Sequence, residues 1–309
     1  MSFKLGIMAV LSAASSIISN WISRTSPLAN GNSTNSVVYA PLTNASWYIF
    51  GNAGSNLTTY LYSTDTSSWT QGTLPTAGRW GASASNGTRI LVFQTGTSSN
   101  TALTSTNGTT WTSVTITGNP TVTNAYYDGT RFIVTNGGGS SISWSLDGTT
   151  GWTTQAVGGA SSWVGYDGTS RHIITRTTTS TTALTSTTGI TGTWSTVTLP
   201  SSNTWLQVFY ANGYWLAAVQ TGGMAYSTNG TTWTLVGTAT GNLYTWIYAN
   251  SKWYSFTSGA STSARYRDTP AATSTSITLG SASGDPNAVA FADNRLVVAT
   301  SGTDIWVGV

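Results

Sequence analysis

Aromatic, amide and guanidinium side chains recur in the sequence near the start of one short apolar run and just after the next. The tryptophans of this set are Trp80, Trp163, Trp205 and Trp246, and the polar residues are Arg79, Arg176, Gln94 and Gln220. Flat rings flanked by amides and a guanidinium suit a sugar, which they would bind by stacking and hydrogen bonding. Alternatively, the tryptophans pack between sheets, as large aromatic side chains commonly do. These eight residues are the candidate ligand-binding residues of the chain.

The sequence offers few residues for acid–base, nucleophilic or metal chemistry. All eight acidic residues are Asp, Cys is absent, and His172 is the only histidine. A zinc or iron site needs several His, Cys or carboxylate ligands, and a catalytic triad needs partners beside its histidine. We therefore expect no metal site, no cofactor and no catalytic residue, with His172 either exposed or packed between sheets.

One motif returns roughly every 40 residues and sets the architecture. Its clearest copies are LTSTNGTTWT at 103–112 and AYSTNGTTWT at 225–234. The tryptophans near the ends of the copies are Trp69, Trp111, Trp152, Trp194 and Trp233. Upstream of the copies, an Asn-Gly or Asp-Gly pair between apolar runs, as in YDGTRFIVT at 127–135, is typical of a β-hairpin. Each repeat therefore predicts four short strands, which is the content of one blade of a β-propeller.

The N-terminal end is expected to supply the fourth strand of the last blade. Residues 287–309 provide three strands of a final blade before the sequence ends. The missing strand is found around Trp21, where SNWISRTSPL at 19–28 resembles SSWTQGTLP at 67–75 in the positions of Trp and Pro. Closure of this kind removes a free sheet edge and joins both ends of the chain in one blade.

The fold class that follows is all-β: a seven-bladed β-propeller of four-stranded blades, in a single domain that covers residues 20–309. Good helix formers are scarce, because Glu is absent and only two lysines occur. The 15 Trp and 14 Tyr supply enough apolar area to fold a chain in which 6% of the residues are charged. Six blades is the alternative, in case the repeat at 243–283 does not complete its sheet.

The turn from Ser105 to Trp111, STNGTTW, resembles the Asp-box of sialidase-like propellers, Ser-x-Asp-x-Gly-x-Thr-Trp. The copies in this chain are usually one residue shorter, and as a blade pattern they cover most of the sequence. In such a turn the Ser and Asx side chains satisfy backbone groups, and Gly adopts the left-handed conformation. The resemblance therefore implies a fold and does not by itself specify an activity.

Sialidase activity, which the resemblance also implies, requires an arginine triad, an Asp acid/base and a Tyr nucleophile paired with Glu. The chain has no Glu. In propeller topology, the turns that contain five of its aspartates lie opposite the substrate face of the family; these are Asp65, Asp128, Asp147, Asp167 and Asp293. Only Asp268, Asp285 and Asp304 remain for the carboxylate pair of a glycosidase. We therefore expect no enzymatic activity, and a sialidase-like glycoside hydrolase is the third hypothesis for function.

Residues 1–19 are predicted to form a docking arm or helix. Apolar residues recur in this segment at steps of four and three, which places them on one stripe of a helix. They are Phe3, Ile7, Val10, Ala14 and Ile17. The segment also has the outline of a secretory signal peptide, but serines interrupt its apolar run, which is too short to span a membrane. We expect the stripe to be buried on a partner protein.

The composition narrows the classes of partner. A net charge of +3 over 309 residues forms no basic patch, so nucleic-acid binding is not expected. Repeat β-proteins rich in Thr, Ser, Gly and Asn and poor in Lys and Glu are similar to the appendage and decoration proteins of bacteriophages.

The first hypothesis for function is a non-enzymatic structural or accessory virion protein. It would dock on a capsid or tail protein through its N-terminal arm and present the propeller for contact with protein or a host surface glycan. The alternative is a secreted or cell-surface propeller that binds a carbohydrate or a receptor. Secretion would remove the first ~14 residues.

Overall fold

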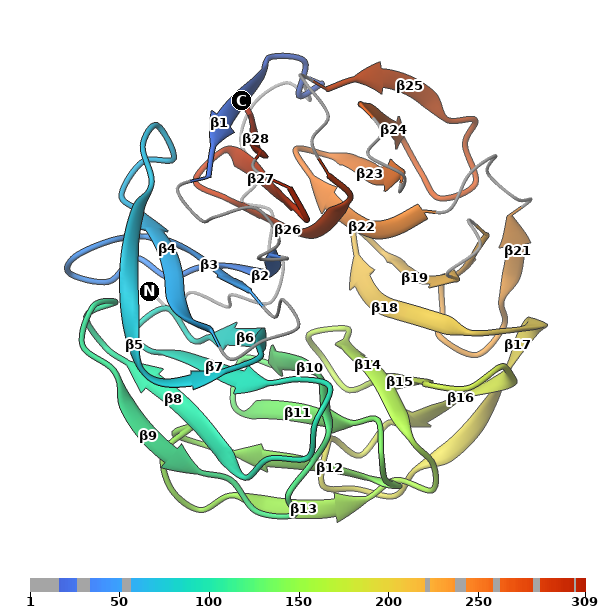
Figure 1. The fold of residues 1–309 in the computed structure, drawn as a ribbon. Coiled ribbons are helices and arrows are strands. Elements are labelled where there is room, and N and C mark those ends of the chain that lie inside the picture. Colours follow the sequence, from blue (N-terminus) through green and yellow to red (C-terminus); the bar gives the residue numbers. More distant parts are fainter. Residues whose placement is uncertain are drawn as a thin grey trace.

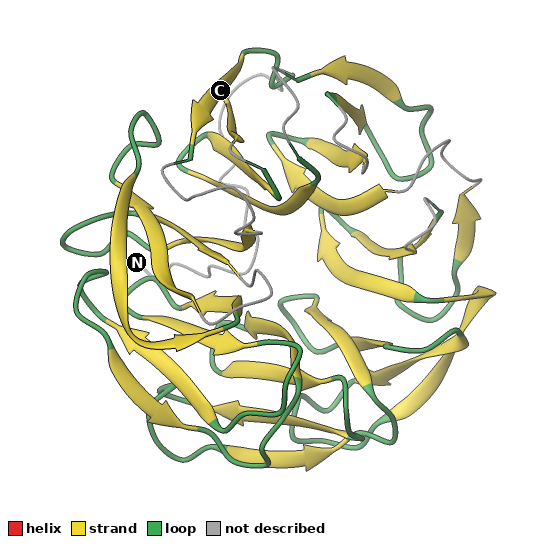
Figure 2. Ribbon diagram, viewed as in Figure 1, coloured by secondary structure: helices red, strands yellow, loops and turns green. Residues whose placement is uncertain are grey.

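The structure is a computed structural model of the chain. The residues that it describes are 17–26, 34–51, 57–219, 223–236, 243–257, 262–279, 284–302 and 304–309. Within these ranges every helix or strand is a strand, and the strands form seven four-stranded sheets. The sheets are arranged as blades around a central axis, with the first strand of each blade innermost (Figures 1 and 2). The predicted seven-bladed β-propeller is confirmed, and the six-bladed alternative is wrong.

We number the blades in chain order, beginning with the blade that starts at β2. Blade 1 contains β2 (Thr34–Tyr39), β3 (Trp47–Gly51), β4 (Leu57–Ser63) and β5 (Thr70–Gly78). Blade 2 contains β6 (Trp80–Ser85), β7 (Ile90–Gln94), β8 (Thr101–Ser105) and β9 (Thr112–Thr115). Blade 3 contains β10 (Val122–Tyr127), β11 (Phe132–Asn136), β12 (Ser141–Ser145) and β13 (Thr153–Ala156).

The second half of the ring repeats the same order of strands. Blade 4 contains β14 (Ser161–Tyr166), β15 (His172–Arg176), β16 (Ser180–Ser186) and β17 (Ser195–Asn203). Blade 5 contains β18 (Trp205–Ala211), β19 (Tyr214–Val219), β20 (Met224–Ser227) and β21 (Thr234–Val236). Blade 6 contains β22 (Leu243–Ala249), β23 (Lys252–Thr257), β24 (Ser263–Arg267) and β25 (Thr275–Thr278). Blade 7 contains β26 (Pro286–Ala292), β27 (Arg295–Thr300), β28 (Asp304–Gly308) and β1 (Trp21–Thr25).

Blade 7 joins the two ends of the chain. Its outermost strand, β1, pairs antiparallel with β28, so that Trp21 lies opposite Gly308 (Figure 1). Beyond this pairing, the N–H of Val309 donates a hydrogen bond to the carbonyl of Asn20 at 3.1 Å. The predicted closure by a strand around Trp21 is therefore confirmed.

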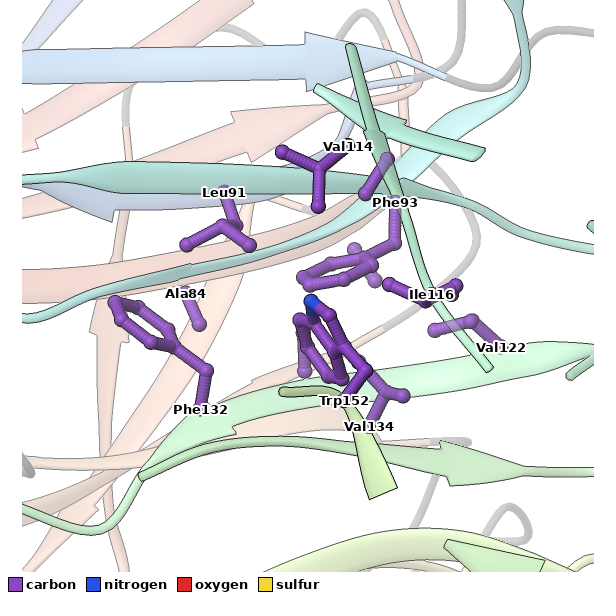
Figure 3. Packing of buried hydrophobic residues seen from close by; sticks show 12 residues of the cluster. Ala84, Leu91, Phe93, Val114, Ile116, Val122, Phe132, Val134 and Trp152 are labelled. Carbon is purple, nitrogen blue, oxygen red and sulfur yellow. The ribbon is translucent and has the colours of Figure 1, made fainter. Parts of the chain in front are cut away.

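The hydrophobic core of the described residues is divided into seven clusters, one at each interface between neighbouring blades. Between blades 2 and 3, Phe93 and Trp152 pack edge to face, with ring centroids 5.9 Å apart (Figure 3). Leu91, Phe132 and Val134 surround them in the same cluster (Figure 3). Each buried side chain adds roughly 25 cal/mol to the free energy of unfolding per Å² of apolar area removed from water. Since each blade is covered by both neighbours, this contribution is complete only when the ring is closed.

Turns of the form Ser-x-Asx connect the third and fourth strands of most blades, as the repeat predicts. In blade 2, the N–H of Gly108 donates to Ser105 Oγ at 2.8 Å, and the N–H of Thr110 donates to Asn107 Oδ1 at 2.8 Å. Gly108 has a φ of +83°, which favours glycine. Corresponding hydrogen bonds hold the turns of blades 1, 3 and 5. The predicted role of these side chains in the turns is therefore confirmed.

Blades 4 and 6 connect their third and fourth strands differently. In blade 4, Ser186 Oγ donates to the carbonyl of Gly189 at 2.8 Å. In blade 6, Arg267 takes the place of the serine, and its Nη1 donates to the carbonyl of Ala272 at 2.8 Å. This buried guanidinium also lies 6.0 Å from the ring centre of Trp246. The guanidinium of Arg267 therefore contacts both this turn and, through a cation–π contact, the innermost strand of its blade.

Candidate functional site

The propeller sorts its connections onto two faces. Because consecutive strands are antiparallel, the connections from first to second strand and from third to fourth strand lie on one face, which we call the turn face. The connections from second to third strand and from one blade to the next lie on the other, which we call the loop face. Of the candidate ligand-binding tryptophans, Trp80 and Trp205 begin the first strands of their blades at the loop-face end. Trp163 is the third residue of β14, and Trp246 lies in the middle of β22.

Three of these four tryptophans belong to the core. The exposed fractions of Trp80, Trp205 and Trp246 are 0%, 1% and 2%. The indole N–H of Trp80 donates to the carbonyl of Thr76 at 3.2 Å. The side-chain amide of Gln207 holds both backbone groups of Trp246 at 2.9 Å. The expectation of a stacking surface formed by these three rings is corrected here, because neighbouring blades already cover the rings.

Trp163 differs from the other three tryptophans because it is half-buried. It lies where the register of β14 and β15 shifts between Ser161 and Val164, and it packs against the core cluster between blades 4 and 5. Arg176, at the end of β15, donates from Nη1 to the carbonyl of Gly158 at 3.4 Å. A ligand role for Trp163 and Arg176 stays a prediction.

The remaining candidates lie mainly in blade 2. Gln94 is opposite Trp80 in the β6–β7 pair, and Arg79 directly precedes Trp80. Gln220 lies outside the described residues. The structure therefore groups the described polar candidates in blades 2 and 4, which are not neighbours in the ring.

His172 has a partner that the sequence did not indicate. Its Nε2 lies 3.3 Å from Oδ2 of Asp128, and each of these side chains is 3% exposed. The ring of Tyr166 stacks on the imidazole, with centroids 4.2 Å apart. His172 begins β15 in blade 4, whereas Asp128 follows β10 in blade 3. Of the two alternatives for His172, packing between blades is confirmed.

Asp128 is held as a carboxylate by several donors. Burial raises its pKa, but hydrogen bonds from His172 and from the backbone N–H groups of Arg131 and Thr130 outweigh burial, so the pKa lies below its ordinary value. At the position of His172, the second strands of blades 1 and 3 begin with Trp47 and Phe132. A polar pair therefore replaces an apolar contact at this one interface.

A groove lies on the turn face between blades 4 and 5. Its volume is about 420 Å³, and Arg171 and several Ser and Thr side chains line it. Arg171 Nη1 donates to Thr185 Oγ1 at 3.0 Å. The repeat pattern did not indicate this groove, although Arg171 ends a recognisable hairpin turn and the neighbouring turn from Ser186 to Trp194 is unusually long.

The aspartates left for a glycosidase pair are divided between the two faces. Asp268 lies on the turn face and pairs with Lys252. Asp285 and Asp304 lie at the loop-face end of blade 7, where Ser23 Oγ donates to Asp304 Oδ1 at 3.3 Å.

Within the described ranges, no three His, Cys, Asp or Glu side chains gather as metal ligands. Over the same ranges, no helix is long and apolar enough to cross a membrane.

The fold defines the class of protein as a seven-bladed β-propeller, and solved structures of this class resemble it closely in shape. A structure of YCF48 bound to D1 peptide superimposes with a TM-score of 0.73 at 12% identity, covering 97% of this chain and 99% of that one. YCF48 from Cyanidioschyzon merolae gives 0.71 at 14% identity, covering 93% and 98%.

An enzyme is also among the similar structures. A catalytically inactive variant of virginiamycin B lyase from Staphylococcus aureus, with quinupristin, gives a TM-score of 0.76 at 12% identity, covering 93% of this chain and 99% of that one. No protein-family model and no curated protein matches the sequence. At these identities the similarity establishes the propeller fold alone.

Proposed function

We propose that this chain is a non-enzymatic structural or accessory virion protein. In this proposal it docks on a capsid or tail protein through its N-terminal arm and presents the propeller for contact with protein or glycan. The observation that carries the proposal is the way in which the chain enters the ring, at Ile17 and Ile18.

Ile18 anchors the N-terminal end in the propeller. It is 1% exposed, belongs to the core cluster between blades 6 and 7, and donates its N–H to Tyr254 Oη at 2.9 Å. Its neighbour Ile17, the last residue of the predicted apolar stripe, is 38% exposed. The other four residues of the stripe, Phe3, Ile7, Val10 and Ala14, lie outside the described residues. A segment fixed at its base to a closed ring would carry the whole propeller to the partner that it binds.

Two further observations support a binding role. The solved structure of YCF48 contains a D1 peptide, so a propeller of this shape serves as a peptide-binding protein in that case. The low charge and the abundance of Thr, Ser and Gly support a place in a virion, in which repeat β-proteins of this composition occur. The candidate residues Trp163 and Arg176 are retained as a contact site for such a partner.

Removal of the arm tests the proposal. Deletion of residues 2–16 spares Ile17 and Ile18, so we expect the propeller to keep its melting temperature within a few degrees. The same deletion should abolish incorporation into the particle, measured by mass spectrometry of purified virions. A second variant keeps the composition of residues 2–16 but scrambles their order. It lacks the apolar stripe without being shorter, so it should also fail to be incorporated. Incorporation of the deletion variant at the wild-type level would refute the docking role.

The secretory alternative makes a different prediction for the same segment. N-terminal sequencing of the native protein should find residues 1–16 intact if they form a docking arm. A mature chain that begins about 14 residues in would instead favour a secreted or cell-surface propeller that binds carbohydrate or a receptor.

A further inference from the structure

Basic residues occupy the same position in five blades, directly before or at the start of the second strand. They are Arg89, Arg131, Arg171, Lys252 and Arg295. Three of them form ion pairs with aspartates of the turn face: Arg131 with Asp128, Lys252 with Asp268 and Arg295 with Asp293. Among the described residues, Arg89 and Arg171 form no ion pair and instead donate to a threonine hydroxyl, at 3.1 Å and 3.0 Å. These two guanidinium charges are therefore not neutralised by a carboxylate.

Of these two arginines, Arg171 alone lines the groove of about 420 Å³ between blades 4 and 5. The groove arises because the turn from Ser186 to Trp194 is two residues longer than the turn from Ser105 to Trp111 in blade 2. Thr187 and Thr193 of this longer turn form part of its wall. Arg89, at the matching position in blade 2, is not among the residues that line the groove.

Contacts on both sides fix Arg171 at this groove. On its own blade it donates to Thr185 Oγ1, and on blade 5 its aliphatic part lies over Gly230, where a Cβ atom would collide with it. A guanidinium has five N–H donors, so further donors remain for a ligand. The charge is therefore held in place before a ligand arrives, which lowers the entropy cost of binding.

The lining favours one class of ligand. It contains a single cation, no carboxylate and no aromatic ring, and apart from Val197 its other residues carry hydroxyl groups. Guanidinium groups bind oxyanions through charge-assisted hydrogen bonds, whereas Ser and Thr hydroxyls both donate to and accept from sugar hydroxyls. A volume of about 420 Å³ lies in the range of small-molecule sites, and an inorganic oxyanion alone would fill only a part of it.

We propose that this groove binds an acidic saccharide, with an oxyanion of the sugar on Arg171 and its hydroxyls on the surrounding Ser and Thr side chains. The inference rests on the proposed function in that it names the class of glycan that the propeller contacts. It uses the turn face, whereas Arg79, Trp80, Gln94, Arg176 and Trp205 of the ligand residues expected from the sequence lie at or next to the loop-face ends of strands.

Binding of trigalacturonate to the full-length protein tests this site by isothermal titration calorimetry. We expect saturable binding that Arg171→Ala weakens at least about tenfold, since a hydrogen bond to a charged group contributes on that scale. Arg89→Ala is the matched control, because it removes an equally unpaired guanidinium that is not part of this groove, and it should bind like the wild type. Thr187→Glu changes an exposed residue, should leave the fold intact, and should abolish binding by placing a carboxylate in the groove.

Other probes separate the sources of the signal. A chondroitin sulfate disaccharide that binds with the same dependence on Arg171 would also support the site, because the shared chemistry is an oxyanion on a sugar. The proposal is overturned by the absence of trigalacturonate binding, by equal binding of neutral galactotriose or of inorganic sulfate, or by equal losses in Arg171→Ala and Arg89→Ala. These measurements use the isolated protein, so their outcome is independent of whether the arm joins a virion.

Discussion

The pair of Asp128 and His172 is the most buried ionisable contact between described side chains of this protein. Both residues lie between blades 3 and 4, at a position where other blades use large apolar side chains. A buried pair of this kind adds little stability compared with an apolar contact, but the loss of one partner leaves a polar or charged group without compensation. The interface between blades 3 and 4 should therefore be unusually sensitive to single substitutions.

Asp128→Ala should lower the free energy of unfolding by about 2 kcal/mol more than Asp167→Ala, because His172 loses its partner. Asp167 is a matched control: it accepts similar hydrogen bonds from the N–H groups of its own turn, at 2.8 to 3.0 Å. Urea denaturation at pH 7 measures both variants. A double variant, His172→Phe with Asp128→Ala, should recover most of the loss. Equal losses in the two single variants would show that the pair between blades contributes nothing.

The pair of Asp128 and His172 should also make the free energy of unfolding depend on pH. The pKa of Asp128 is below its ordinary value in the folded protein, so its stabilising contribution is present above about pH 4 and disappears as the pH falls through the folded pKa. We expect the wild type to lose more stability than Asp128→Ala between pH 5 and pH 2, as measured by urea denaturation at each pH.

At the residue scale, the sequence predicted the Ser-x-Asx turns because all of their hydrogen bonds are local. It could not predict the partner of His172, because Asp128 lies in another blade and only the packing of two sheets brings the residues together. Likewise, Trp80 and Trp163 are the same residue type near the start of a first strand, and the sequence alone does not distinguish them. Trp80 begins β6 opposite Gln94, whereas in β14 the matching place opposite Arg176 belongs to Ser161, and Trp163 comes two residues later. Trp80 is buried and Trp163 is half-buried.

At the scale of elements, β1 is the strand whose position depends on the most distant parts of the sequence. It pairs with β28, and just before it the N–H of Ile18 donates a hydrogen bond to Tyr254 of β23 in blade 6. Burial raises the pKa of Tyr254 to about 12, while the hydrogen bond from the backbone of Ile18 acts in the opposite direction. The neutral hydroxyl is therefore the form that accepts this bond.

Tyr254→Phe should lower the free energy of unfolding by about 1–2 kcal/mol, because the buried N–H of Ile18 loses its acceptor. The raised pKa means that the contribution of Tyr254 is present below about pH 10 and is lost as the pH rises toward 12. Guanidinium denaturation at pH 8 and pH 11 should therefore show a smaller difference between variant and wild type at pH 11. Tyr266→Phe, which changes the neighbouring ring 6.1 Å away, is the control and should have little effect at pH 8. A constant difference across this pH range would contradict the assignment.

At the scale of the whole molecule, the number of blades and their closure followed from the repeat, because every blade needs the same strands and turns. The groove at Arg171 did not follow, since it results from a local difference between copies: one turn is longer than its counterparts. A repeat pattern predicts what the blades share, and sites arise where one blade departs from the pattern.

Deletion of residues 1–25 should destabilise the propeller by several kcal/mol or make it insoluble, because β28 becomes an exposed edge and the core around Trp306 is opened. Appending residues 17–26 after Val309 through a short linker should restore the melting temperature and solubility, since Val309 and Asn20 are already hydrogen-bonded. Differential scanning calorimetry compares the three proteins. A deletion variant as stable as the wild type would mean that β1 is dispensable for the ring.

The shared blade also imposes an order on biosynthesis. Along the chain β1 comes before the six blades and β28 comes after them, so a ribosome makes these two strands about half a minute apart at typical rates of elongation. Six blades can assemble before β28 is made, but the seventh cannot, and until then the first strand has no partner. A chain truncated before β28 keeps this unpaired strand, which exposes it to chaperones and proteases.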